Sequence, residues 1–249
     1  MLIEGLSPRR VAIFSDIHGN LPALEKVLEE IDSSNVDFIV CCGDVVGYGA
    51  NPNECVELLR ERSIATIAGN HDYAALSLID ITYFNEIAKR SILWTRSVLK
   101  PENEQFLRNL PLSLEVADML FVHASPRSPE SWNYVITLGD ARQSFRSFGQ
   151  KICFIGHSHT PFVVENCDGQ LSCPTVPVVE LKEDCRYLVN VGSVGQPRDR
   201  NPEACFAIYD REQHLVEIRR VQYDLARAQK AIADAGLPPE LAERLNFGL

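Results

Sequence analysis

The sequence lacks any long run of apolar residues, and its charged residues show no basic surplus. Its longest apolar runs span only a few residues, such as 38–42, so we expect no segment that crosses a bilayer. The 249 residues include 24 basic and 34 acidic side chains, which gives a formal charge of −10. Non-specific nucleic-acid binding and binding to anionic membranes both depend on an excess of Lys and Arg, so neither is expected.

Cysteine spacings typical of zinc or redox sites are missing as well. The chain has eight cysteines but no C-x-x-C pair, and Cys41, Cys42 and Cys153 fall in apolar runs where a thiol acts as a small hydrophobe. We therefore expect reduced, structural cysteines. Residues 7–10 (SPRR) superficially resemble a twin-arginine signal, but the apolar run that follows ends at Asp16 and is too short for a signal-peptide core. We expect a cytoplasmic protein.

Length and composition are those of an ordinary globular chain, with 45% hydrophobic and 23% charged residues. No internal repeat, low-complexity segment or Pro/Gly/Ser-rich linker divides it, so we expect one domain over residues 1–249. The first seventy residues alternate between two periodicities. Strands are expected at 11–14, 38–42 and 64–67, and helices at 21–31 and 53–62, with Asn20 as a helix N-cap. Short connections in a strand-helix order indicate parallel strands.

The second half of the chain is richer in strands. A helical pattern covers 82–110 with a break at Pro101, and it either caps the functional site or packs on the sheet edge. Buried strands are expected at 120–123 and 152–156, followed by short strands at 163–166, 176–181, 186–191, 204–209 and 215–221. Helices are expected over 224–247. The whole pattern predicts an α/β domain of layered sheets, parallel first and more antiparallel later.

Polar side chains that bind metals follow the predicted strands. In α/β sheets, ligands bind beyond the carboxyl ends of the strands, and five of the six histidines fall at such positions. The sixth, His214, is expected at the surface. Each pattern alone has an ordinary explanation, such as a turn, a helix cap or a core histidine. The segments concerned are Asp16-Ile17-His18, Gly43-Asp44, Gly69-Asn70-His71-Asp72, His123 and Gly156-His157-Ser158-His159.

Together these segments predict a metal site. We expect two carboxylates, one amide and four or five imidazoles to converge on one edge of one sheet. Burying so many ionisable groups without a counter-charge is costly, and bound divalent cations remove that cost. Mixed nitrogen and oxygen ligands suit Mn, Fe, Co, Ni or Zn. The ligands are too many for one ion, so two ions bridged by one carboxylate are expected.

The ordered set of motifs resembles that of the calcineurin-like metallophosphoesterase superfamily, in particular its small prokaryotic phosphodiesterase and diadenosine-tetraphosphatase-related branch. The resemblance covers residues 11 to about 200, including the segment 190–198 (NVGSVGQPR), and no ligand position departs from the pattern. It implies a four-layer α/β/β/α sandwich of two mixed sheets. It also implies that Asp16, His18 and His159 hold one metal. Asn70, His123 and His157 then hold the second, Asp44 bridges the two, and His71 faces the substrate.

The resemblance further implies hydrolysis of a small phosphodiester or nucleotide-type substrate by a metal-bridging hydroxide, with manganese among the candidate metals. His71 would protonate the leaving oxygen or stabilise charge on the phosphoryl group. Arg198 either binds a phosphate oxygen or is a solvated loop residue. Residues 47–49 (GYG) are expected to form a flexible loop at the rim of the site.

Two other functions fit the same motifs. A phosphomonoesterase, including a protein phosphatase, uses the same ligands but needs a groove of protein size. A non-catalytic scaffold related to a retromer subunit shares the fold but has a defective metal site. All ligands and the substrate-facing histidine are present here, which favours an enzyme.

Overall fold

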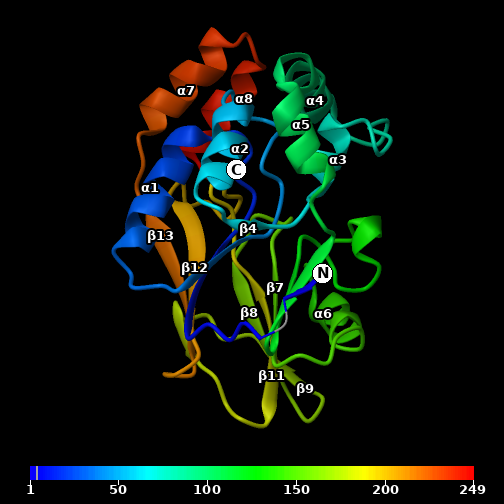
Figure 1. The fold of residues 1–249 in the computed structure, drawn as a ribbon, viewed down its shortest axis with the longest axis vertical. Coiled ribbons are helices and arrows are strands. Elements are labelled where there is room, and N and C mark those ends of the chain that lie inside the picture. Colours follow the sequence, from blue (N-terminus) through cyan, green and yellow to red (C-terminus); the bar gives the residue numbers. More distant parts are fainter. Residues whose placement is uncertain (4) are drawn as a thin grey trace.

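The computed structural model describes residues 1–3 and 5–249 and contains two mixed β-sheets (Figure 1). One sheet has six strands in the order β10-β13-β12-β2-β3-β4, and the other has seven in the order β1-β5-β6-β7-β11-β8-β9. The six-stranded sheet comprises β2 (Arg10–Phe14), β3 (Phe38–Cys41), β4 (Ala65–Thr66), β10 (Val178–Glu180), β12 (Ala204–Asp210) and β13 (Leu215–Val221). The seven-stranded sheet comprises β1 (Leu2–Ile3), β5 (Ser113–Val116), β6 (Met119–Val122), β7 (Ile152–Ile155), β8 (Phe162–Cys167), β9 (Gln170–Ser172) and β11 (Cys185–Asn190).

The sheets pack face to face because each strand presents alternate side chains to opposite sides. Val11 and Ile13 of β2 point into an apolar layer shared with Phe121 of β6 and Phe154 of β7. Phe14 of β2 instead faces a helical layer built on α1 (Leu21–Asp32) and α2 (Pro52–Glu61). On the far side, the seven-stranded sheet packs against α6 (Leu138–Ser144). The predicted four-layer α/β/β/α sandwich is thus confirmed.

Helix boundaries follow local capping. Asn20 accepts a hydrogen bond from the Ala23 amide at 3.3 Å and begins α1, as the sequence predicts. The helical pattern at 82–110 forms α4 (Glu86–Val98) and α5 (Pro101–Arg108), separated at the expected proline. The C-terminal pattern forms α7 (Leu225–Asp234), α8 (Pro239–Glu243) and a 3₁₀ turn at Arg244–Asn246. None of the helices in the described part has the length and apolarity needed to cross a membrane.

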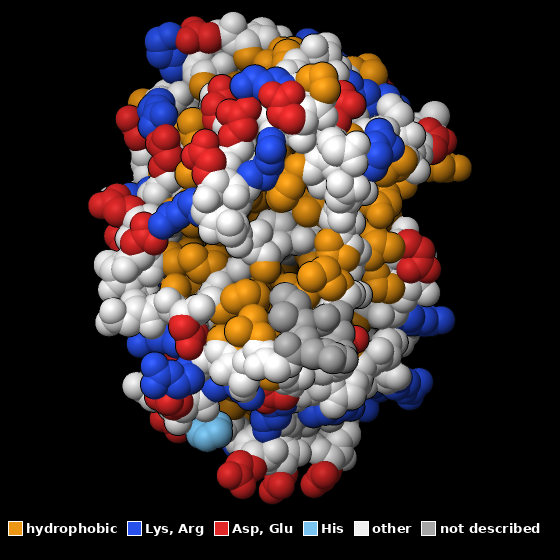
Figure 2. All heavy atoms as spheres, in the orientation of Figure 1, with side chains coloured by type: hydrophobic (Ala, Val, Ile, Leu, Met, Phe, Trp, Pro, Cys, Tyr) orange, Lys and Arg blue, Asp and Glu red, His pale blue; other side chains and the backbone are white. Residues whose placement is uncertain are grey.

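Other elements were not predicted from the sequence. They are strands β1, β5 and β9, helix α3 (Asn70–Ala75), helix α6 and a 3₁₀ turn at Pro129–Ser131. Each is short, so its periodicity is too brief to stand out from the surrounding loops. Helices α3, α4, α5, α7 and α8 gather at the end of the sandwich that lies uppermost in Figure 1. On the face shown in Figure 2, acidic and basic side chains are interspersed around an apolar central region.

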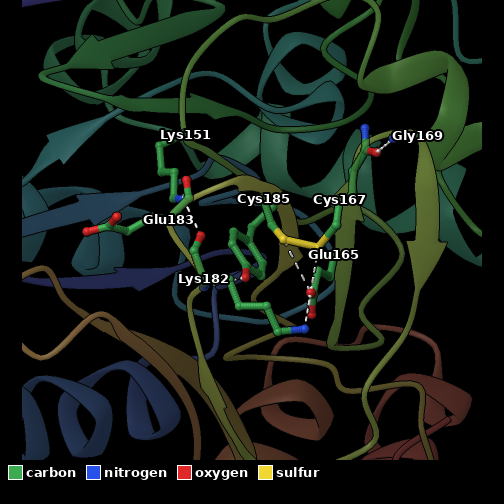
Figure 3. Close-up of a disulfide and its surroundings, with 9 residues drawn as sticks. Lys151, Glu165, Cys167, Gly169, Lys182, Glu183 and Cys185 are labelled. Atoms are coloured by element: carbon green, nitrogen blue, oxygen red, sulfur yellow. Dashed lines mark hydrogen bonds and ion pairs between the residues drawn. A yellow bond between two sulfur atoms is a disulfide. The ribbon is translucent and has the colours of Figure 1, made fainter.

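The expectation of reduced cysteines is wrong for one pair. Cys167 of β8 and Cys185 of β11 form a disulfide (Figure 3). The antiparallel register places them directly opposite each other, with their Cα atoms 4.3 Å apart, although 18 positions separate them in the chain. The remaining cysteines are free thiols, and all of them except Cys173 are buried, consistent with a packing role.

Candidate metal centre

The predicted ligands converge at one end of the sandwich, but they come from two sheets rather than one edge of one sheet. Asp16 follows β2, Asp44 follows β3, and Asn70 follows β4, all in the six-stranded sheet. His123 and His157 follow β6 and β7 of the seven-stranded sheet. Sequence periodicity identifies strand ends but not the sheet to which a strand belongs, which explains the error. His214 lies far along the chain on an exposed turn, as expected.

Asp16, His18 and His159 form the first ligand group. Their donor atoms all lie within 4.8 Å of one another, and all three side chains are buried. The His159 Nε2 atom is 3.2 Å from Asp16 Oδ1, and the His18 Nε2 atom is 3.7 Å from the same oxygen. The two Nε2 atoms are 3.1 Å apart. This arrangement leaves one position that all three donor atoms face.

Asp44, His123 and His157 form the second group, again with donor atoms within 4.8 Å of one another. The His123 Nε2 atom lies 3.3 Å from Asp44 Oδ2, 3.2 Å from His157 Nδ1 and 3.1 Å from Asn70 Oδ1. The family resemblance implies that Asn70 belongs to this group, and the structure places its amide oxygen there. The second group therefore offers two oxygen and two nitrogen donors.

Asp44 lies between the two groups. Its Oδ2 atom is 3.6 Å from His18 Nε2 and 3.3 Å from His123 Nε2, so one oxygen faces both groups. Its other oxygen, Oδ1, accepts a hydrogen bond from the His71 amide at 2.7 Å, which fixes the plane of the carboxylate. This position is the one that a bridging ligand requires.

Backbone carbonyls orient three of the imidazoles. In each ring Nδ1 faces a main-chain oxygen, which favours protonation of Nδ1 and leaves the Nε2 lone pair directed into the site. The pairs are His18 with Val46 at 3.2 Å, His123 with Cys42 at 2.8 Å and His159 with Gln196 at 2.6 Å. Outer hydrogen bonds of this kind are typical of histidine ligands to metals.

The donor set fits divalent metal ions. With Nδ1 protonated on His18 and His159, two unprotonated Nε2 atoms face each other, and neither can donate a hydrogen bond to the other. The Asp16 Oδ1 atom beside them is buried and has no hydrogen-bond partner among the described residues. Facing lone pairs and an unpartnered carboxylate oxygen are costly unless a cation lies between them. Imidazole with carboxylate and amide oxygen suits borderline transition metals.

Charge coupling within the site is strong. Burial alone would raise the pKa of Asp16 and Asp44, but neighbouring histidines, His159 for the first and His123 for the second, hold both carboxyl pKa values below the ordinary range. Burial would lower the pKa of His123, yet Asp44 raises it to about 9. Burial, followed by the charge of His123, lowers the pKa of His157 to about 3. At neutral pH both carboxylates are therefore ionised, and in the absence of metal His123 is protonated on both ring nitrogens and carries the charge that a bound cation would replace.

Several of the ligand positions have a strained backbone. Asp16, His18, Asp44, His157 and His159 all have positive φ angles, between 51° and 67°. Non-glycine residues in this left-handed region cost about 1 kcal/mol or more each, and such residues cluster at functional sites. Five such residues persist at this site because the surrounding structure offsets their conformational cost.

Two glycines allow the strand-end loops to approach one another. A Cβ atom on Gly69 would lie 2.1 Å from Asp44 Oδ1, and one on Gly156 would lie 2.4 Å from Asp16 Oδ2. Neither glycine therefore leaves room for a side chain. The glycines that precede Asn70 and His157 in the sequence are therefore explained by this close packing around the two carboxylates.

His71 lies beside both ligand groups without joining either one. Its ring centroid is 4.8 Å from that of His18, and its Nδ1 atom is buried without a hydrogen-bond partner in the described part of the chain. Burial lowers the pKa of His71 to about 4, so the imidazole is neutral at pH 7. The ring also packs against Tyr48 at 4.5 Å and Phe84 at 5.2 Å.

The sequence did not identify the aromatic residues around the site. Tyr48 belongs to the 47–49 segment that was expected to form a loop at the rim, but it is only 7% exposed and its ring contacts the His18 and His71 rings. That expectation is wrong as to position. Tyr134 stacks on His157 with ring centroids 3.9 Å apart. The flanking glycines of Tyr48 were the one available signal, because Gly47 has φ 91° and packs directly on His71.

A cavity of about 430 Å³ adjoins the centre and is rich in aromatic side chains. His71 and His157 form part of its lining, while Tyr134 lies on the wall that follows β6. Residues 79, 80, 83–85 and Ala88 supply another part, so the start of the 82–110 segment lines the cavity while α5 lies apart from it. This volume is within the usual range for small-ligand sites.

Arg198 is partly buried beside the first ligand group. Its amide donates a hydrogen bond to the His159 carbonyl at 3.1 Å, and its guanidinium carbon lies 5.7 Å from the Tyr48 ring centroid. Its Nη2 atom donates to Gln196 Oε1 at 2.8 Å. The side chain is therefore held at the site rather than freely solvated.

Comparison with known proteins identifies the family. The model of the calcineurin-like phosphoesterase superfamily domain matches residues 10–214. The chain belongs to this superfamily. The matched residues include every one of the candidate ligands described above, and members of the superfamily are metal-dependent phosphoesterases.

Individual relatives agree with this membership. The uncharacterized protein MJ0912 of Methanocaldococcus jannaschii is 44% identical over 242 residues, 96% of this chain and 98% of that protein. The phosphodiesterase MJ0936 of the same organism is 26% identical over 188 residues, 75% of this chain and 90% of its own. A solved metallophosphoesterase from Sphaerobacter thermophilus is 38% identical with a TM-score of 0.84, covering 98% of this chain and 100% of that one.

Proposed function

We propose that this superfamily member is a binuclear-metal-dependent phosphodiesterase that acts on small phosphodiester or nucleotide-type substrates. One observation carries the proposal: Asp44 Oδ2 lies within 3.6 Å of a nitrogen donor from each of two complete ligand groups, with His71 beside them. Manganese is our choice among the metals that such ligands suit. We also propose that it acts in the cytoplasm, a location that the six free cysteines fit and the Cys167–Cys185 disulfide does not.

Each residue at the centre has a defined task in such a reaction. Bound metal ions supply a water-derived nucleophile at neutral pH and positive charge for the phosphoryl oxygens. Asp16, His18 and His159 would hold one ion, while Asn70, His123 and His157 would hold the other. Asp44 would contact both ions, since its Oδ1 is already occupied by the His71 amide and its Oδ2 is free to face both groups.

His71 acts on the substrate rather than on the metals. Its ring lies next to the ligands, and its side-chain Nδ1 is unpartnered among the described residues. It either transfers a proton to the leaving oxygen or donates a hydrogen bond to the phosphoryl group. The neutral state of the ring in the free site suits the hydrogen bond, whereas proton transfer requires the negative charge of bound substrate to raise the pKa.

Arg198 binds a phosphate oxygen. Its Nε atom is buried and lacks a hydrogen-bond partner in the described residues, and its backbone is tied to the carbonyl of the ligand His159. A guanidinium in this position donates charge-assisted hydrogen bonds to phosphate, which are among the stronger hydrogen bonds in proteins.

The preference for small diesters is supported by the cavity and by a relative. The cavity beside the centre is lined by Phe84, Tyr134 and Trp132 and has the size of a small organic group rather than a protein surface. The related protein from M. jannaschii bears the name phosphodiesterase. A phosphomonoesterase or protein phosphatase remains the competing function, and substrate comparison separates them.

A hydrolysis panel in Mn²⁺ tests the proposal. Bis(p-nitrophenyl) phosphate, cyclic nucleotides, dinucleoside polyphosphates and phosphopeptides are compared at equal metal, with Asp44→Asn as the inactive control. We expect turnover of diesters that EDTA abolishes and excess Mn²⁺ restores. Hydrolysis confined to phosphopeptides would show a protein phosphatase, and the absence of metal-dependent hydrolysis on every substrate would overturn the enzymatic proposal.

A further inference from the structure

His157 differs from the other histidine ligands in what holds its ring. Main-chain carbonyls face the Nδ1 atoms of His18, His123 and His159. The Nε2 atom of His157 is buried and has no hydrogen-bond partner in the part of the chain that the structure describes. Its Nδ1 atom lies 3.2 Å from His123 Nε2, which can donate a hydrogen bond only while it carries a proton. A metal ion bound to His123 Nε2 displaces that proton, so hydrogen bonding does not support the His157 ring in the metal-bound state.

The ring of Tyr134 packs face to face on the His157 ring. The two ring centroids are 3.9 Å apart, and the ring planes are inclined by 20°. Stacked aromatic pairs stabilise each other beyond the area that they bury. A stacked neighbour also restricts rotation of the imidazole about its Cβ–Cγ bond, because the turned ring would collide with the tyrosine. The contact is made by the ring face of Tyr134, so its hydroxyl is not needed for it.

The backbone on both sides of Tyr134 is anchored, although the Tyr134 side chain is 50% exposed. The Asn133 carbonyl accepts a hydrogen bond from the Ser125 amide at 3.0 Å. Val135 is 4% exposed and belongs to an apolar cluster that includes residues of β6 and β7. These two strands also lead into the second ligand group. Tyr134 is therefore fixed to the same strands that carry the histidines of that group.

Trp132 contacts the other histidine of the second group. Its ring meets the His123 ring edge to face, with centroids 6.0 Å apart, and it meets the Tyr73 ring in the same way at 5.3 Å. The φ angle of Trp132 is 53°, in the left-handed region that bulky residues rarely adopt. Strained residues of this kind cluster at functional sites. Residues 132–134 thus supply an aromatic contact to each histidine of the second ligand group.

We propose that Tyr134 is a positioning residue for the second metal site: by stacking on His157, it fixes that ring in place of the main-chain hydrogen bond that orients the other ligand histidines. Outer contacts of histidine ligands set the orientation of the ring and the affinity of the site for its metal. Tyr134 also lines the aromatic cavity, so an organic group bound there lies beside the residue that positions a metal ligand. This inference rests on the proposed function, because it takes His157 as a ligand of the second ion.

The first test measures metal affinity by equilibrium dialysis with Mn²⁺. We expect Tyr134→Leu to weaken the binding of one ion about tenfold, near the low end of the roughly 10–100-fold losses that follow removal of outer contacts of metal ligands. The other ion should bind as in the wild type, and Tyr134→Phe should bind both normally because it keeps the ring. Tyr83→Leu is the matched control, since Tyr83 lines the same cavity but is 95% exposed. Urea unfolding checks that each variant is folded.

Two results of the dialysis would refute the positioning role. Unchanged affinity for both ions in Tyr134→Leu would show that His157 keeps its orientation without the stacked ring. Equal weakening of both ions would show a general effect on the centre rather than support of one ligand. Weak binding in Tyr134→Phe as well would place the effect on the hydroxyl, contrary to the stacking argument.

The second test locates the affected site by cadmium NMR, in which each bound ion gives its own signal. The signal that His157→Gln removes belongs to the second ligand group. We expect Tyr134→Leu to shift or broaden this signal, whereas Tyr134→Phe leaves it as in the wild type. A change confined to the other signal, or no change, would overturn the proposal. Neither test needs turnover, so a protein that bound two ions but hydrolysed no substrate would contradict the proposed function and still decide the role of Tyr134.

Discussion

Asp72 connects two loops that carry candidate metal ligands. Its replacement therefore tests how the fold positions those ligands. The side chain is fully buried. Its Oδ1 atom accepts hydrogen bonds from the amides of Val45 at 2.9 Å and Val46 at 3.2 Å, and its Oδ2 atom accepts one from Gly69 at 2.9 Å. One carboxylate therefore joins the loops that follow β3 and β4, which carry Asp44 and Asn70.

The expected cost of Asp72→Ala follows from these contacts. The substitution leaves three buried amides unpaired, and each costs about 1–3 kcal/mol. We expect a loss of at least about 3 kcal/mol, a large share of the roughly 5–15 kcal/mol that stabilises most native proteins. Asp72→Asn should fall between wild type and alanine, because its amide oxygen can still accept while its NH₂ group faces another donor.

Urea unfolding followed by circular dichroism measures the effect, with Asp140→Ala as the matched control. Asp140 also accepts backbone hydrogen bonds at a helix start, from Ile136 at 3.2 Å and Thr137 at 2.9 Å, but it lies near the surface. Loss of such a cap costs about 1 kcal/mol. If Asp72→Ala destabilised the protein no more than Asp140→Ala does, the argument that buried amides depend on Asp72 would be wrong.

Further predictions concern the ligands themselves. The purified protein should bind about two equivalents of transition metal per chain, and a stoichiometry of one with full activity, by elemental analysis, would exclude two working ions. Asp44→Asn should weaken both metal sites together and abolish turnover, whereas loss of Asp16 should mainly affect one site; metal titration of both variants separates these results. His71→Ala should keep its metal but lose about 10²–10⁴ in rate on nucleoside esters and clearly less on aryl diesters, and equal losses would indicate a charge stabiliser instead of an acid. Gly156→Ala should reduce metal content because its Cβ would lie 2.4 Å from Asp16 Oδ2, while Gly149→Ala, which has open space around it, should not.

Local sequence patterns were sufficient to predict much of the six-stranded sheet and the helices between its strands. The alternation of strands and helices between residues 11 and 67 predicted β2, α1, β3, α2 and β4 in order, because each of these elements depends mainly on its own side-chain period and caps. The strand ends carried the candidate ligands for the same reason. Their convergence is a property of the fold, while their role as metal ligands stays a prediction that metal analysis decides.

Contacts between residues far apart in the chain could not be predicted from these local patterns. The partition of the strands between two sheets, the opposition of Cys167 and Cys185, and the burial of Tyr48 each depend on residues far apart in the chain. A period of two reveals that a strand has two faces, but it does not say which sheet completes the layer. The disulfide pair looked like two unrelated cysteines because only the β8–β11 register places them opposite each other.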